Sequence, residues 1–72
     1  MHLEALIKTI KNRRETMHVT QETLAKLSGV GLRTLKNFES GKGNPTLKNL
    51  QKLADILGLE ICIQVKTISS NK

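Results

Sequence analysis

Two short amphipathic segments separated by a glycine turn constrain the fold of this chain more than any other feature. The first segment begins after Thr20, a favourable helix N-cap, and ends at Gly29, where glycine adopts a left-handed backbone without strain. The second runs from Leu32 to Glu39, and Val30 fixes the turn from the inside. Apolar residues at helical spacing give the two segments an inward face: Leu24, Ala25, Leu27, Leu35 and Phe38. The sequence therefore predicts two helices packed across a tight turn.

A longer amphipathic helix precedes this pair and another helix follows it. The first covers about residues 2–16, where apolar residues recur at three- and four-residue steps and lysines fill the other face. After a loop rich in turn residues at 40–45, Thr46 can cap the last helix and Gly58 can stop it. The apolar set of this helix is Leu47, Leu50, Leu53, Ala54 and Leu57. We expect a mainly α-helical single domain over residues 1–72, with a core of Leu24, Ala25, Val30, Leu35, Phe38, Leu50 and Leu53.

The pattern changes to strict alternation after Gly58. Apolar residues occupy every second position of residues 59–66, namely Leu59, Ile61, Ile63 and Val65, which predicts a β-strand. Because one strand cannot satisfy its own backbone, we expect it to pair antiparallel with the same strand of a second copy, forming a homodimer. A fifth short helix or a disordered tail is the alternative for this segment. Residues 69–72 are expected to be disordered.

The charge and the aromatic content narrow the class of partner. The formal net charge is +6, from 12 Lys and Arg against 6 Asp and Glu. A basic excess of this size favours a polyanionic partner, although it also serves solubility alone. Phe38 is the only aromatic residue, whereas proteins that bind single-stranded nucleic acid stack its bases on aromatic side chains. Double-stranded DNA needs no such platform and is the nucleic acid that the composition favours.

Other classes of function lack the residues they need. No apolar run approaches the roughly 18 residues of a membrane span, and no export signal is evident, so we expect a cytoplasmic protein without a membrane partner. His2, His18 and Cys62 are too scattered for a zinc site, and a single cysteine cannot form an internal disulfide. No carboxylate pair, nucleophile–base arrangement or phosphate-binding loop is present. We expect no metal, no cofactor and no enzymatic activity.

A set of short motifs carries a resemblance to a known family. They are Thr20-Gln21, Leu24-Ala25 one turn later, Gly29-Val30 at the turn, Glu39-Ser40-Gly41-Lys42, and Asn44-Pro45. In this order and spacing they resemble the helix-turn-helix of Xre/Cro-type phage repressors, over about residues 7–59. The strand predicted after the last helix is similar to that of HipB-type antitoxins, where it joins two subunits.

The resemblance implies a lambda-repressor-like domain of four or five helices with a C-terminal strand that pairs across a dimer. It implies a transcriptional repressor that binds a palindromic operator in double-stranded DNA as a homodimer. The alternative is an antitoxin that neutralises a partner toxin protein and autoregulates its operon. A third possibility is that the helix-turn-helix is only a scaffold within a larger assembly.

The resemblance also assigns roles to individual residues. Base contacts are implied for Leu32, Arg33 and Asn37. Contacts to the DNA backbone are implied for Gln21, Thr34, Lys36, Lys42 and Asn44. Among the remaining lysines, Lys48 follows the loop directly and is the one that we expect to contact a phosphate. Arg14 and Glu39 match a family ion pair that ties the first helix to the end of the third.

Chemistry agrees with the assigned base contacts. Arg33 can pair bidentately with guanine and Asn37 with adenine, while Leu32 can only pack on a thymine methyl group. Positions 33 and 37 are one helical turn apart and project into the same groove. Gly31 and Thr23 depart from the family, which has a serine-like cap and a capping-box glutamate at these positions.

Overall fold

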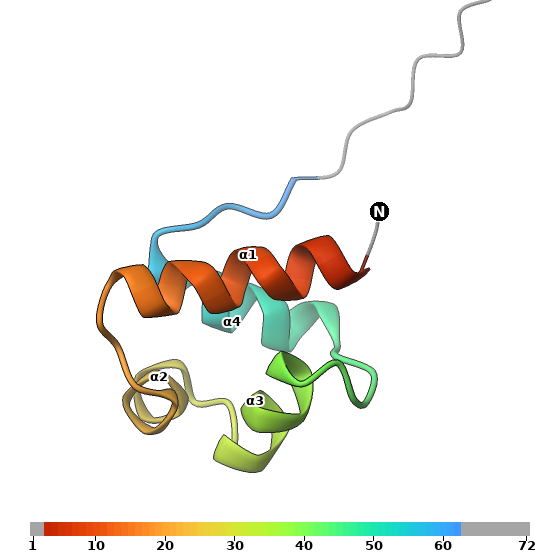
Figure 1. Ribbon diagram of the computed structural model, residues 1–72, viewed down its shortest axis with the longest axis horizontal. Helices are drawn as coiled ribbons and strands as arrows, with labels where there is room; N and C mark the ends of the chain where they lie inside the picture. The colour runs from red at the N-terminus through yellow and green to blue at the C-terminus, as the bar shows by residue number, and fades with distance from the viewer. Residues whose placement is uncertain (1–2, 63–72) are drawn as a thin grey trace, which may run out of the picture.

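Short connections join the four helices that the described residues form. The computed structural model describes residues 3–62 (Figure 1). The helices are α1 (Leu3–Thr16), α2 (Gln21–Ser28), α3 (Leu32–Glu39) and α4 (Leu47–Leu57). These bounds agree with the helices predicted from the sequence, and the described residues contain four helices rather than five. None of these helices is long and apolar enough to cross a membrane.

Two threonines start helices in the way the sequence predicts. The hydroxyl of Thr20 accepts a hydrogen bond of 3.0 Å from the backbone N–H of Thr23, and it also contacts the Thr23 hydroxyl at 2.9 Å. The hydroxyl of Thr46 accepts a bond of 3.1 Å from the backbone N–H of Asn49. Each cap satisfies a backbone donor that has no partner within its helix, and this fixes where α2 and α4 begin.

A left-handed residue turns the chain away at the end of all four helices, and Gly29, with a φ of 77°, has this role after α2. Gly41 ends α3 and Gly58 ends α4, with φ angles of 82° and 68°. In α1 this position is taken by His18, whose φ is 58°. The next residue, Val19, donates a hydrogen bond of 3.1 Å to the carbonyl of Arg14, which closes the Schellman motif. Because this position holds no glycine, the sequence indicated only a connector between the first two helices.

The hydrophobic core lies between the four helices. All seven residues predicted to form it are buried, and Ile10, Ala54 and Leu57 join them. Ile10 brings α1 into the core, and Leu57 brings the end of α4. The core therefore draws on every helix, and this fixes how α2 and α3 sit relative to each other.

Two leucines predicted to face inward do not. Leu27 is 59% exposed and Leu47 is 51% exposed, so the predicted apolar faces were wrong at these positions. At about 100° per residue, Leu27 lies well to one side of the face centred on Leu24 and Ala25, and Ser28 falls on that face instead. The Ser28 hydroxyl accepts a bond of 3.2 Å from the backbone N–H of Val30 and so replaces apolar packing there. Leu47 lies in the first turn of α4, before the helix reaches the core.

The predicted C-terminal strand is not present in the described part of the chain. Residues 59–62 form no regular secondary structure, and Ile63, Val65 and the predicted tail lie outside the described residues. A strand requires a neighbour to pair its backbone groups, and residues 3–62 of one chain supply none. Leu59 and Ile61 pack against the core instead.

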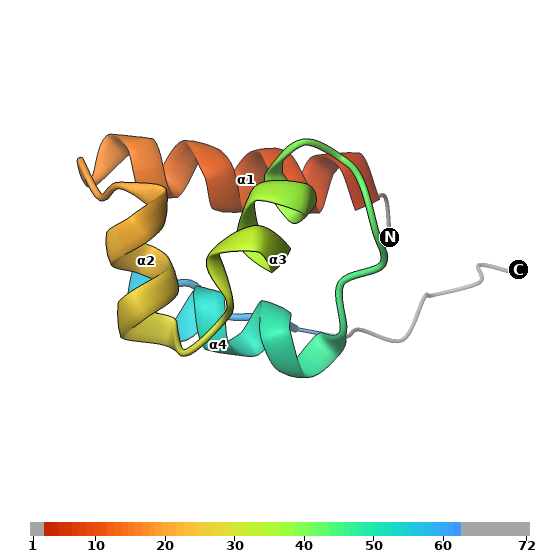
Figure 2. The same ribbon diagram turned by 90° about the horizontal axis from the view of Figure 1, so that it is seen from below.

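The packing of the helices leaves α3 at one side of the molecule. α2 packs against α3 and α4, while α1 packs against α3 and α4 from the other side. Seen from below, α3 lies in front of the other helices (Figure 2). The segment at residues 59–62 lies on the opposite side, beyond α1 (Figure 1). One side of the molecule therefore presents α3 and the other presents the C-terminal segment.

Candidate nucleic-acid interface

Helix α3 presents a polar, basic face to solvent. Arg33, Thr34, Lys36 and Asn37 are all exposed, whereas Leu35 is fully buried. The hydrophobic side of α3 is thus used in the core and its polar side is open. Arg33 and Asn37 are separated by one helical turn and lie on the same strip of this open face.

Leu32 differs from the other residues predicted to contact bases. It is half-buried and packs against the hydrophobic core, so only part of its side chain remains open. The N-cap before it, Gly31, forms no side-chain hydrogen bond. The N-terminal turn of α3 is therefore held by the packing of Leu32 rather than by a side-chain cap.

The loop after α3 adds predicted backbone-contact residues to the same face. A hollow of about 110 Å³ lies between α3 and this loop, and it is lined by Thr34, Asn37, Phe38, Lys42, Gly43, Asn44 and Pro45. The backbone N–H of Lys42 donates a hydrogen bond of 2.8 Å to the carbonyl of Asn37, which holds the loop against the helix. The structure thus brings Lys42 and Asn44 next to Thr34 and Asn37.

The end of α3 is tied to α1 by an ion pair. The guanidinium of Arg14 donates to the two carboxylate oxygens of Glu39, at 2.7 Å from Nε and 2.8 Å from Nη2. The side chains are 11% and 3% exposed. A third donor, Nη1 of Arg14, bonds the carbonyl of Val19 at 2.8 Å. The hydrogen bond to Glu39 raises the pKa of Arg14 above its ordinary value, against a lowering by burial, so the guanidinium stays charged.

Gln21 completes this network. Its side-chain Nε2 donates a hydrogen bond of 3.0 Å to Oε1 of Glu39. Gln21 is half-buried and is the first residue of α2. The family resemblance implied a phosphate contact for Gln21 and an ion pair for Glu39, but nothing in the sequence indicated that the two residues touch. Their contact joins the start of α2 to the end of α3.

The face around α3 is electropositive. Arg33, Lys36, Lys42 and Lys48 are exposed along residues 32–48. The acidic residue within this stretch is Glu39, which is buried and neutralised by Arg14. Lys48 extends the basic residues into the first turn of α4. This combination of an exposed polar helix and surrounding cations suits a polyanion.

Comparison with known proteins identifies the family. Residues 10–64 match the family described as helix-turn-helix. The chain belongs to the Xre/Cro-type helix-turn-helix family. Helices α2 and α3 are the two helices of the motif, and the turn between them contains Gly29 and Val30.

Named relatives of this helix-turn-helix protein are regulators of transcription. It is 40% identical over 52 residues to the cryptic phage CTXphi transcriptional repressor RstR of Vibrio cholerae serotype O1, a match that covers 72% of this chain and 46% of RstR. It is 42% identical over 52 residues to an uncharacterised helix-turn-helix-type transcriptional regulator of Archaeoglobus fulgidus, covering 72% of this chain and 73% of that protein. A similar regulator of Methanocaldococcus jannaschii is 40% identical over 52 residues, which cover 79% of it. The chain thus spans about half the length of RstR and most of the two archaeal regulators.

Proposed function

We propose that this protein is a sequence-specific repressor of transcription that binds double-stranded DNA as a homodimer. The observation that carries the proposal is the exposed face of α3, where Arg33 and Asn37 share one strip next to a basic loop. In a helix-turn-helix the second helix lies in the major groove while the first crosses the backbone. Membership of the family and the names of the relatives support this use of the face.

The side chains on this face divide into two roles. Arg33 offers a bidentate donor pair to guanine, and Asn37 offers a donor and an acceptor to adenine. Lys42, Asn44 and Lys48 meet phosphates, which positions the protein without reading sequence. Lys36 and Thr34 flank the base-reading strip and contact the groove wall or the backbone. Gln21 bonds a phosphate from the start of α2.

The homodimer gives the operator its symmetry. Two copies related by a two-fold axis present two α3 helices to half-sites one helical turn apart, about 34 Å. The alternating apolar residues that follow Gly58 are the proposed dimer element, paired antiparallel between subunits. Repression follows from occlusion of a promoter by the bound dimer.

Selection from a pool of random duplexes tests this function. The full chain is incubated with the pool at about 150 mM salt, and bound duplexes are sequenced over several rounds. We expect a near-palindrome with half-site centres about 10 base pairs apart. The Asn37→Ala variant serves as the matched control and should lose preference at an adenine position while keeping the spacing. Enrichment of no sequence over the starting pool would overturn the proposal.

A further inference from the structure

A groove lies between the N-terminal part of α1 and the chain that follows α3. Its volume is about 270 Å³, and it is lined by Glu4, Ile7, Lys8, Lys11, Glu39, Ser40 and Gly41. In the view from below, the chain after α3 crosses the N-terminal half of α1 (Figure 2). Two of the lining residues are lysines of α1, where the sequence indicated only a basic face opposite the apolar one. The DNA contacts proposed above include no residue of α1.

The two lysines of this groove carry charges that no neighbour neutralises. Lys8 and Lys11 are exposed, and among residues 3–62 neither of them forms an ion pair. They are three positions apart in one helix, so their side chains leave α1 on the same side. A lysine that lines a groove covers the wall with its apolar stem and keeps its ammonium group in water. The groove therefore presents two free cations beside each other.

The two carboxylates of the lining differ in their charge environment. Glu39 is buried, and Arg14 donates hydrogen bonds to both of its oxygens at 2.7 and 2.8 Å. Its negative charge is thus compensated inside the fold. Glu4 is exposed and has no ion-pair partner among residues 3–62. The lining therefore sets two cations against one uncompensated carboxylate, and it favours an anion.

The polar groups of the loop at this groove are already bonded within the fold. The backbone N–H of Ser40 donates to the carbonyl of Lys36 at 3.1 Å, and the hydroxyl of Ser40 donates to the carbonyl of Asn37 at 3.0 Å. The backbone N–H of Gly41 donates to the carbonyl of Phe38 at 3.1 Å. An anion at the groove would therefore be bound by the lysines and not by the loop backbone.

The groove adjoins the proposed DNA interface on two sides. On one side, its lining residue Glu39 accepts a hydrogen bond of 3.0 Å from Gln21, which is proposed to contact a phosphate. On the other side, its lining residue Gly41 directly precedes Lys42, which is proposed to contact another. The surface that carries Lys8 and Lys11 is thus continuous with both contacts.

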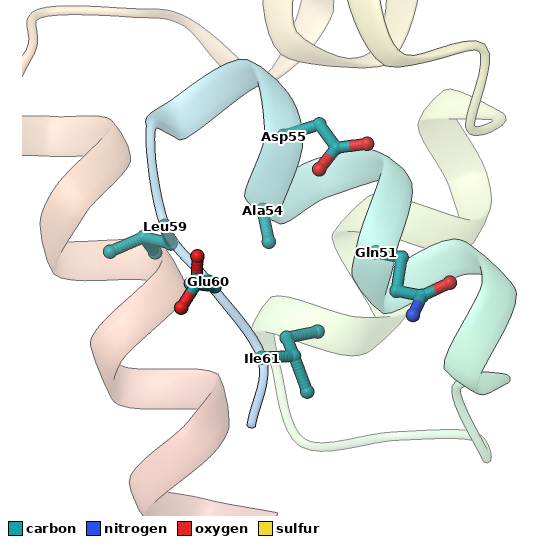
Figure 3. Close-up of a pocket in the computed structure, with 6 residues that line it drawn as sticks. All are labelled: Gln51, Ala54, Asp55, Leu59, Glu60 and Ile61. Atoms are coloured by element: carbon teal, nitrogen blue, oxygen red, sulfur yellow. The ribbon is translucent and has the colours of Figure 1, made fainter. Parts of the chain in front are cut away.

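A second groove, beside α4, has the opposite charge. Its volume is about 410 Å³, and it is lined by Gln51, Ala54, Asp55, Leu59, Glu60 and Ile61 (Figure 3). Asp55 and Glu60 are exposed, and the lining includes no lysine or arginine. This groove repels a polyanion, whereas the groove on α1 attracts one.

We propose that the DNA-binding surface continues onto α1, where Lys8 and Lys11 contact phosphates next to those contacted by Gln21 and Lys42. The inference rests on the proposed function and adds two contacts to it. Phosphate contacts carry no sequence information, so these lysines strengthen binding to every duplex alike. Glu4 limits the surface, because its carboxylate repels phosphates that lie beyond Lys8.

The salt dependence of DNA binding tests these contacts. In the full chain, Lys8→Gln combined with Lys11→Gln should reduce the magnitude of the slope of log affinity against log salt by about 2, because two fewer counterions are released. The corresponding double arginine variant keeps both charges and should keep the slope. Each substitution is at an exposed position, and circular dichroism checks that the fold is retained.

Lys26→Gln is the matched control for a single lysine of this groove. Lys26 is an exposed residue of α2 that does not line the groove, and its loss should leave the slope unchanged. Lys8→Gln and Lys11→Gln should each reduce the magnitude of the slope by about 1. An unchanged slope in the double glutamine variant, or single effects no larger than that of Lys26→Gln, would overturn the proposal.

Neutral phosphates locate the contacts on the DNA. A series of selected duplexes carries one uncharged methylphosphonate at each position in turn, and affinity is measured for each duplex. The double glutamine variant should lose its sensitivity at one or two phosphates, next to those where Gln21→Ala or Lys42→Ala loses it. Full sensitivity of the double variant at every phosphate would contradict the proposal.

A substitution of Glu4 tests the position of the DNA with the opposite sign. Glu4→Gln removes the uncompensated carboxylate of the groove and should raise affinity for DNA. Asp55→Asn makes the same change of charge at the acidic groove and should have a smaller effect, because charges are screened over about 8 Å at 150 mM salt. Equal effects of the two substitutions would contradict the placement of DNA along α1.

The outcomes separate this surface from the proposed function. A chain that selects a palindrome but keeps its slope without Lys8 and Lys11 retains the proposed function and loses this surface. A chain that binds all duplexes alike, with a smaller slope in the double glutamine variant, retains the surface and loses sequence-specific repression. A double variant that loses self-association in sedimentation equilibrium and keeps its slope would show that a second copy occupies the groove, and this would overturn the inference.

Discussion

The side-chain amide of Gln21 donates a hydrogen bond of 3.0 Å to Glu39, which joins the first residue of α2 to the last residue of α3. The same carboxylate accepts two bonds from Arg14 in α1. One buried carboxylate therefore connects three helices. Because both helices of the motif must meet DNA together, this connection sets the orientation of α2 relative to the face of α3.

Replacing Gln21 by Ala should weaken binding to all duplexes by a similar factor. The side chain contacts a phosphate in the proposed complex and braces α3 through Glu39, and neither contact depends on the base sequence. Gln21 carries no charge, so the slope of log affinity against log salt should not change. Lys42→Ala is the matched control, and it should reduce the magnitude of that slope by about 1 through the loss of one released counterion. Fluorescence anisotropy over a salt series measures both. A smaller slope for Gln21→Ala would be inconsistent with this role.

Removal of Arg14 should destabilise the fold strongly. In Arg14→Met the buried Glu39 carboxylate loses its cation, and breaking a buried pair on one side costs about 3–5 kcal/mol. The side chain of Arg14 is 11% exposed, so water can partly solvate the site. We therefore expect a loss of stability at the lower end of this range. Urea unfolding followed by circular dichroism measures the change. The double variant Arg14→Met, Glu39→Met should be more stable than Arg14→Met alone, because no uncompensated charge remains. An equal loss in both variants would show that the charge left behind is not the cause.

Replacing His18 by Gly should stabilise the protein. His18 has a φ of 58°, in the left-handed region where a side chain costs about 1 kcal/mol or more relative to glycine. For a domain of this size, a gain of about 1 kcal/mol raises Tm by about 4–8 °C. His18→Ala keeps the Cβ atom and should show no such gain. Thermal unfolding of the unsubstituted protein and the two variants measures the three Tm values. A Tm for His18→Gly at or below that of His18→Ala would show that the left-handed backbone at His18 does not destabilise the protein.

The Cys62 thiol should react slowly near neutral pH. Its hydrogen bond to Glu60, together with the negative charge of that carboxylate, raises the pKa of Cys62 above its ordinary value. The thiolate is the reactive form, so at a given pH less of it is present than in a free cysteine. The alkylation rate should therefore rise at a higher pH than for a model peptide. Glu60→Gln should shift the rate profile to lower pH, whereas Glu4→Gln should not. An unshifted profile in Glu60→Gln would contradict this assignment.

The sequence predicted those parts of the fold that depend on neighbouring residues. Thr20 and Thr46 start helices through bonds to residues three positions later, so their effect is visible in the sequence. Leu27 was assigned wrongly to the inward face of α2, because Ser28 takes that face through its bond to Val30. The left-handed His18 has no sequence signal comparable to that of a glycine. The contact of Gln21 with Glu39 spans 18 positions and depends on the packed fold.

The strand expected after Gly58 shows that a sequence pattern does not by itself predict strand pairing. Its alternation is visible in the sequence and in the burial of Leu59 and Ile61. Regular strand structure depends on backbone groups of a neighbour, which in our proposal belong to a second chain. A pattern within one chain predicts which face of a strand is apolar, but it does not predict which strand lies beside it.

The central property of the proposed repressor is that α3 reads base edges through Arg33. Comparison of Arg33→Ala with Lys42→Ala on the selected operator and on a scrambled duplex tests this directly. We expect Arg33→Ala to lower operator affinity by about 5- to 150-fold, corresponding to 1–3 kcal/mol, with a much smaller effect on the scrambled duplex. Lys42→Ala should lower both affinities alike. An equal loss on the two duplexes for Arg33→Ala would contradict the claim that this helix reads sequence.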